Sequence, residues 1–193
     1  MIAKSGYSSQ LGFEIYLNNS KLGEKLWDTI CSFGKKYNLR PGAPNLIDRI
    51  EAGLLSFGND MTSENSPLEC GFEKYCALSS DIDFIGKAKL KSEKNLGPKL
   101  KLCGIAFGGE AQSACTIPWP IYFNNLKIGE ITSGIYNPSL KVNTGIALVM
   151  TENLDKHSTV KVKALNSKIT EGVICSLPFT ISKNYELINQ IRY

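Results

Sequence analysis

The chain has 193 residues and a formal net charge of +4, with 42% hydrophobic and 21% charged residues. These values are typical of a globular protein with one large domain or two small ones. Its lysines are spread along the chain, and no apolar run reaches the roughly 18 residues that span a bilayer, so we expect neither nucleic-acid nor membrane partners. No signal peptide is visible, and we therefore expect a cytoplasmic protein.

The stretch "SGYSSQLGFEIYL", residues 5–17, predicts two turn segments, with Tyr7 between them, followed by a strand that carries polar groups on one face. Strand side chains alternate, so Phe13, Ile15 and Leu17 point one way, toward a core. Glu14 and Tyr16 share the opposite face. An acid and a phenol side by side suit a binding site, and they also suit a plain half-exposed strand.

Residues 20–38 carry one apolar stripe with helical spacing. Ser20 is a plausible N-cap, and a Lys-rich turn ending in Asn closes the helix. The stripe that we expect to face the core consists of Leu22, Leu26, Ile30, Phe33 and Tyr37.

A second helix is predicted from about Pro44, with the core stripe Leu46, Ile50 and Leu54. On a neighbouring face Arg49 has small residues three, four and seven positions further on, which leave room for a ligand to approach. The alternative is that Arg49 pairs with a nearby acid on a solvated face.

Beyond residue 56 the predicted structure changes from loop and helix to short strands. Residues 56–72 predict a loop, a short charged helix begins at about Phe84, and a Gly-Pro break follows at 97–98. Turn signals then recur every 8–12 residues, which predicts an all-β barrel or sandwich with a hairpin at Asn124-Asn125. We therefore expect an α+β protein with an α+β part at 1–96, a β part at 97–180 and a polar tail at 181–193.

The cysteines and the single histidine favour no metal site and no hydrolytic triad. The six cysteines form no C-x-x-C pair, and His157 lies in a polar stretch where we expect it to be solvated. No G-x-S-x-G turn is present. We expect reduced, partly buried thiols, with one disulfide pair as the alternative.

Four motifs in order resemble the folate-binding aminomethyltransferase family, typified by the T-protein of glycine cleavage. They are "GYSSQLGFEI", "RIEAGLLSFGND" from Arg49, "PLECGF" from Pro67 and "FIGK" at 84–87. Within that family the residues of these motifs, together with "VICSLPF" near the end, are most similar to those of the tetrahydrofolate-dependent dimethylsulfoniopropionate demethylases. The resemblance runs from residue 3 to about 179.

The resemblance implies a partial ferredoxin-like α+β folate-binding domain followed by a Greek-key or jelly-roll-like barrel. It implies that tetrahydrofolate is the cofactor, held by Glu14, Tyr16 and Arg49. A carboxylate can accept two adjacent pterin N–H groups, and Arg suits the anionic folate tail. Tyr7 matches a position that faces the sulfonium substrate in demethylases, where an aromatic ring attracts a cation.

The implied reaction transfers a methyl group from a sulfonium to folate N5 and needs little acid–base catalysis, so no catalytic residue is named. Two alternatives remain: an aminomethyltransferase that serves glycine cleavage with a lipoyl carrier, and a folate-binding module without turnover. The partner is a small-molecule substrate, and a homodimer is compatible with the sequence. Because the family's N-terminal half has no counterpart here, we expect the isolated chain to be inactive.

Overall fold

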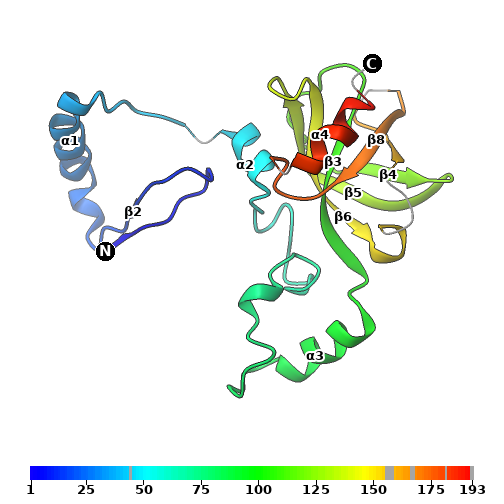
Figure 1. Ribbon diagram of the computed structural model, residues 1–193. Helices are drawn as coiled ribbons and strands as arrows, with labels where there is room; N and C mark the ends of the chain where they lie inside the picture. The colour runs from blue at the N-terminus through cyan, green and yellow to red at the C-terminus, as the bar shows by residue number, and fades with distance from the viewer. Residues whose placement is uncertain (44, 155–158, 166–167, 181, 192–193) are drawn as a thin grey trace.

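A closed β-barrel forms the centre of the molecule, and two smaller lobes extend from it in the computed structural model (Figure 1). The structure describes residues 1–193 apart from 44, 155–158, 166–167, 181 and 192–193, so the predictions for His157 and for a helix start at Pro44 lie outside the described residues. Helices and strands both occur, which confirms the α+β class.

The first lobe contains a two-stranded ribbon and one amphipathic helix. Its elements are β1 (Ile2–Ala3), β2 (Glu14–Ile15), η1 (Ser20–Leu22), α1 (Gly23–Gly34) and η2 (Lys35–Tyr37). The predicted helix over residues 20–38 is confirmed as these three consecutive helical segments, and the side chain of Asn19, rather than Ser20, caps the first. It ends where Asn38 adopts the left-handed conformation.

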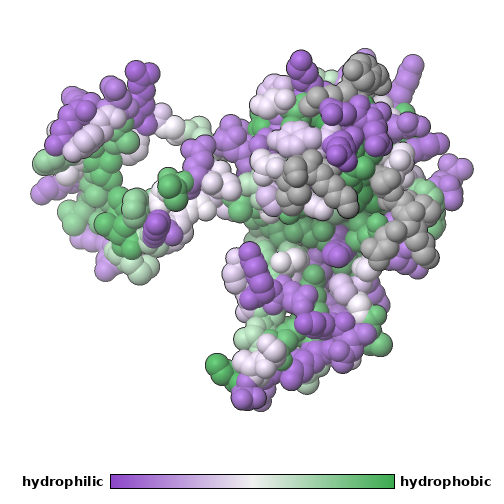
Figure 2. Space-filling model, in the orientation of Figure 1, coloured by the Kyte–Doolittle hydropathy of each residue, from purple (hydrophilic) through white to green (hydrophobic). Residues whose placement is uncertain are grey.

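The prediction that the apolar faces of this lobe are buried is wrong for this chain. Phe13 is 69% exposed and Phe33 is 72% exposed, and none of the described residues of 1–45 is buried. Apolar spacing predicts a face, but that face is buried only when another element covers it. Figure 2 shows apolar side chains on the surface of this lobe.

Helix α2 (Leu46–Ala52) joins the first lobe to the barrel. Asn45 caps its start, and Gly53 ends it in the left-handed conformation at φ 71°. Ile50 is fully buried, as predicted. The Glu51 carbonyl accepts a hydrogen bond of 2.8 Å from the backbone N–H of Phe179.

The second lobe consists of a loop, η3 (Glu73–Tyr75) and α3 (Lys87–Leu96). The predicted helix is confirmed but begins three residues later than Phe84, after Gly86 at φ 92°. Lys87 is buried, and its ammonium group donates to the carbonyls of Ser80 and Ile82 at 2.7 and 2.6 Å.

The β part is a closed, six-stranded antiparallel barrel. Its strands are β3 (Leu100–Phe107), β4 (Trp119–Phe123), β5 (Leu126–Asn137), β6 (Val142–Met150), β7 (Thr159–Val162) and β8 (Thr170–Cys175), with η4 (Thr151–Asn153) after β6. The order β3-β6-β5-β4-β7-β8 contains a Greek key, because β3 lies beside β6 at the end of the β4–β6 meander. The predicted hairpin at Asn124-Asn125 is confirmed, and both residues have positive φ.

The final residues are not the polar tail that was predicted. Helix α4 (Ser182–Asn189) packs on the barrel, where Ile188 is fully buried and Ile191 is buried with it. The buried Asn184 amide exchanges hydrogen bonds of 3.1 and 2.8 Å with the backbone of Ser176. The apolar spacing of "LINQI" was too short to stand out from the polar residues around it.

The accessible surface is larger than the mass of the chain predicts. It amounts to 13060 Å², whereas a compact monomer of 21.2 kDa exposes about 9,100 Å². Two lobes extend from the barrel (Figure 1), and such a shape exposes more surface than a compact one.

Candidate functional site

The ribbon at the start of the chain brings Glu14 and Tyr16 to one face. Ile2 pairs with Ile15 and Ala3 with Glu14, and backbone hydrogen bonds of 2.9 and 2.8 Å join Met1 to Tyr16 in the same antiparallel register. Because residues two apart on an extended strand share a face, the carboxylate and the phenol project together. Both side chains are exposed.

Glu14 keeps one carboxylate oxygen available. The Ser5 hydroxyl donates to Oε2, and Oε1 has no hydrogen-bond partner among the described residues. A carboxylate held on one side in this way can still accept the N–H groups of a flat heterocycle. The role of Glu14 and Tyr16 in folate binding stays a prediction.

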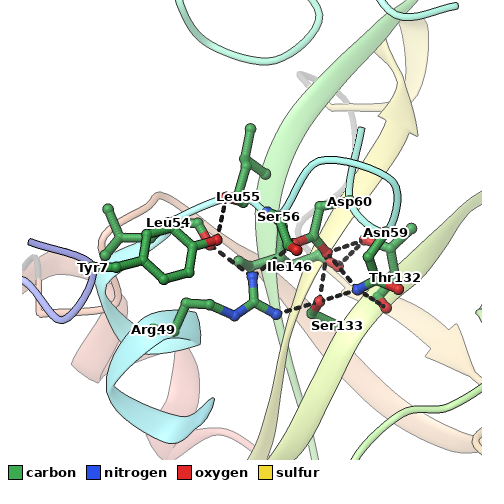
Figure 3. A network of polar contacts seen from close by, with 10 residues as sticks. All are labelled: Tyr7, Arg49, Leu54, Leu55, Ser56, Asn59, Asp60, Thr132, Ser133 and Ile146. Atoms are coloured by element: carbon green, nitrogen blue, oxygen red, sulfur yellow. Dashed lines mark hydrogen bonds and ion pairs between the residues drawn. The ribbon is translucent and has the colours of Figure 1, made fainter. Parts of the chain in front are cut away.

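Tyr7 lies in the turn between β1 and β2 and reaches toward the barrel. Its hydroxyl donates to the carbonyl of Leu55, directly after α2, while the residue remains 50% exposed (Figure 3). The hydrogen bond holds the polar end of the side chain, and part of the residue stays open to solvent. An anchored aromatic ring can attract a cation.

Arg49 lies on α2 and is buried, with its side chain 10% exposed. Its Nη1 donates to the carbonyl of Leu54 and to Asp60 Oδ2, both at 2.7 Å, and its Nη2 donates to Ser133 Oγ at 2.5 Å. The alternative of an acid partner is therefore observed, although on a buried face rather than a solvated one. The predicted contact with the folate tail stays a prediction.

A buried polar network, which the sequence did not reveal, surrounds this arginine. We call it the Asp60 network: Arg49, Asn59, Asp60, Thr132 and Ser133. Asp60 Oδ1 accepts from the hydroxyls of Thr132 and Ser133 at 2.7 and 2.6 Å, and the Asn59 amide donates to Ser133 Oγ at 2.7 Å (Figure 3). A signal was present in "FGND", where Asp60 follows a tight turn at Gly58, but nothing local pointed to its partners on β5.

The predicted residues thus form two pairs. Tyr7 and Arg49 donate to the consecutive carbonyls of Leu55 and Leu54, and Glu14 and Tyr16 lie two residues apart on the ribbon. Among the described residues, no hydrogen bond connects one pair to the other.

The thiols contribute no ligand cluster. All six cysteines are free, and burial is the main cause that raises the pKa of Cys103 and of Cys175 to about 12. Within the described part of the chain, no three Cys, His, Asp or Glu side chains gather as metal ligands would. In the same residues no helix has both the length and the apolar character to cross a membrane.

Family models match both parts of the chain. Residues 1–80 match the GCVT N-terminal domain, and residues 101–180 match the glycine cleavage T-protein C-terminal barrel domain, which coincides with the barrel observed here. The chain belongs to the glycine cleavage T-protein family. The two matches lie on either side of the predicted break at 97–98.

Several relatives within the T-protein family are similar over most of the chain. The dimethylsulfoniopropionate demethylase DmdA of Ruegeria pomeroyi is 43% identical over 149 residues, which are 77% of this chain and 40% of the relative. An aminomethyltransferase of Thermoanaerobacter sp. (strain X514) is 34% identical over 191 residues, which are 96% of this chain and 50% of the relative.

A solved structure shows the same fold. The glycine cleavage system aminomethyltransferase T of Bartonella henselae superposes with a TM-score of 0.73 at 23% identity, over 93% of this chain and 49% of that one. The chain therefore spans half or less of the length of these members of the T-protein family.

Proposed function

We propose that the chain supplies the second half of a tetrahydrofolate-dependent methyltransferase that demethylates dimethylsulfoniopropionate. The observation that carries the proposal is the 43% identity to a dimethylsulfoniopropionate demethylase. The exposed acid and phenol on one face of the ribbon support it from the structure. A cytoplasmic location and a homodimer stay predictions.

The residues of the ribbon fit a reduced pterin. The free oxygen of Glu14 can accept an N–H group from the heterocycle, and Ser5 fixes the other oxygen so that the carboxylate keeps its orientation. Tyr16, on the same face, can donate a hydrogen bond or stack on a flat ring. We assign Glu14 and Tyr16 to folate binding on this basis.

Tyr7 supplies the contact with the methyl donor in this proposal. A sulfonium is a cation without N–H or O–H donors, so the electron-rich face of an aromatic ring is a suitable partner. We place Arg49 in the wall behind Tyr7, because the terminal nitrogens of its guanidinium already hold protein oxygens.

The methyl transfer depends on the alignment of the two reactants and not on an acid that assists the leaving group. Tetrahydrofolate, when bound, supplies the N5 nucleophile that receives the methyl group. As the N5–C bond forms, the C–S bond breaks, its electron pair stays on sulfur and a neutral thioether leaves without needing an acid. The methylated N5 then releases its proton to solvent. The residues of the chain orient the reactants and exclude water.

A comparison of two variants tests the site. In the complete protein, which joins this chain to the upstream half that its relatives have, we expect Glu14→Ala to lower tetrahydrofolate affinity more than Tyr7→Phe, as measured by titration. Glu24→Gln, on the exposed side of α1, is the matched control and should change nothing. Equal and negligible effects of the Glu14 and Tyr7 variants would remove the assignment.

The second candidate function is transfer of an aminomethyl group, and one observation favours it. An aminomethyltransferase aligns with 96% of the chain, against 77% for the demethylase. Turnover of the complete protein with dimethylsulfoniopropionate, set against an aminomethyl-loaded lipoyl carrier, distinguishes the two. Activity only with the carrier would replace the demethylase proposal.

A further inference from the structure

Strand β5 contains a bulge at the point where it meets Asp60. Its pairing with β6 shifts register between Ile131 and Ser133, so Thr132 is an extra residue in the ladder. On a regular strand the side chains of residues 132 and 133 would point to opposite faces. The bulge breaks that alternation, and both hydroxyls reach the same oxygen, Asp60 Oδ1, at 2.7 and 2.6 Å.

Ser133 also fixes the guanidinium of Arg49. A hydroxyl has one proton and two lone pairs, and Ser133 uses the proton on Asp60 and accepts from Arg49 Nη2 at 2.5 Å and from the Asn59 amide at 2.7 Å. Asp60 Oδ2 holds Nη1 of the same guanidinium at 2.7 Å. Both ends of the planar group are therefore held, which leaves it one orientation.

The oriented guanidinium and Asp60 together hold the segment after α2. Arg49 Nη1 donates to the carbonyl of Leu54 at 2.7 Å, and Asp60 Oδ2 accepts from the backbone N–H of Ser56 at 2.8 Å. Leu55 lies between these two anchors, and its carbonyl is the group that accepts from the Tyr7 hydroxyl. The direction of that carbonyl is thus set from both sides (Figure 3).

We propose that Ser133 and Asp60 are positioning residues that fix the orientation of the Tyr7 phenol through Arg49 and the 54–56 segment. The β5 bulge, more than 120 residues further along the chain than Tyr7, would in this way shape the wall that faces the methyl donor. The part that concerns the substrate rests on the proposed function, whereas the positioning of Tyr7 does not.

Fluorine NMR of 3-fluorotyrosine-labelled protein tests the positioning without any ligand. The chain has eight tyrosines, and Tyr7→Phe identifies the resonance of interest. In Ser133→Ala we expect this resonance to move most of the way toward that of a solvated tyrosine. Arg49→Lys should do the same, because an ammonium group can pair with Asp60 but cannot span both the Leu54 carbonyl and Ser133.

Thr144→Val is the matched control. Thr144 is a fully buried hydroxyl on the neighbouring strand β6 and donates to the Ile135 carbonyl at 3.4 Å, outside the Asp60 network. The control should lower the melting temperature without moving the Tyr7 resonance. An unchanged Tyr7 resonance in a folded Ser133→Ala or Arg49→Lys protein overturns the proposal, and Arg49→Lys decides if Ser133→Ala does not fold.

Kinetics of the complete protein separate this proposal from the proposed function. Loss of one positioning hydrogen bond should raise KM for dimethylsulfoniopropionate by about 2- to 10-fold in Ser133→Ala and leave kcat close to wild type. If the Tyr7 resonance moves and KM does not, the positioning holds and the role of Tyr7 in substrate binding is refuted. If neither moves, the positioning itself is refuted.

Discussion

Replacing Asp60 by alanine should destabilise the barrel far more than replacing an exposed acid on β5. The Asp60 side chain is fully buried and pairs with Arg49 at 2.7 Å. It also accepts from Ser56 N–H at 2.8 Å and from two β5 hydroxyls at 2.7 and 2.6 Å. Its removal leaves a buried guanidinium without a counter-charge and several donors without an acceptor.

The expected loss follows from that environment. Removing one partner of a buried ion pair costs about 3–5 kcal/mol, and this is a large share of the about 5–15 kcal/mol that stabilises a typical domain. For a chain of this length the corresponding fall in melting temperature is about 6–20 °C. Asp60→Ala with Arg49→Ala should lose less than the sum of the single variants, by about 1–3 kcal/mol, because the second change removes the orphaned charge.

Urea unfolding followed by fluorescence measures the effect. The chain has two tryptophans, and Trp119 is buried in the barrel whereas Trp27 is exposed on α1, so a Trp27→Phe background leaves a signal that reports the barrel. The control is Glu130→Ala, which removes an exposed pair with Lys127 and should cost about 0–1 kcal/mol. Equal losses in the Asp60 and Glu130 variants would refute the reasoning.

Four further outcomes follow from burial and close packing. Because burial raises the pKa of Cys103 and Cys175 from 9.0 to about 12, their thiols should resist alkylation at neutral pH until the barrel unfolds. The unfolded chain loses these protons first, so the free energy of unfolding should fall as the pH rises from 9 to about 12, and Cys103→Ala should reduce that slope in urea titrations. Gly129→Ala should prevent soluble expression, since its Cβ would lie 2.3 Å from a carbonyl oxygen of β6, whereas Gly23→Ala meets nothing within 4 Å and should leave the melting temperature within a few degrees. Ile188→Asp, which places a charge at a fully buried site, should remove the hydrogen-exchange protection of α4, and retained protection would show that α4 does not depend on this contact.

Local patterns were enough to predict an all-β barrel or sandwich and most helices. Alternating strands, the Asn124-Asn125 turn and the apolar spacing of residues 20–38 are properties of neighbouring residues, and each produced the expected element. The same patterns do not say what covers an apolar face. That is why the side of α1 that carries Phe33 was predicted as core and is exposed.

The Asp60 network could not be predicted because its members are distant in sequence. Arg49 and Ser133 are separated by 84 positions, and Asp60 and Thr132 by 72. Their contact depends on a bulge in β5, and although Gly134 follows that bulge directly, the local sequence does not say which distant residues meet it. Arg49 was noticed because small residues surround it, but its partners became apparent only when the strand register was known.

The position of Arg49 explains how one residue could suggest both a ligand contact and a structural pair. The groups that approach the Arg49 guanidinium are Asp60 and the β5 bulge, which belong to the chain itself. The residue nevertheless remains connected to the candidate site, because the carbonyl it holds precedes the one that Tyr7 binds. The barrel would therefore affect a ligand at Tyr7 through the consecutive peptide groups of Leu54 and Leu55. On the positioning that we propose, the barrel would influence the candidate site even though none of its side chains contacts Tyr7 through a hydrogen bond among the described residues.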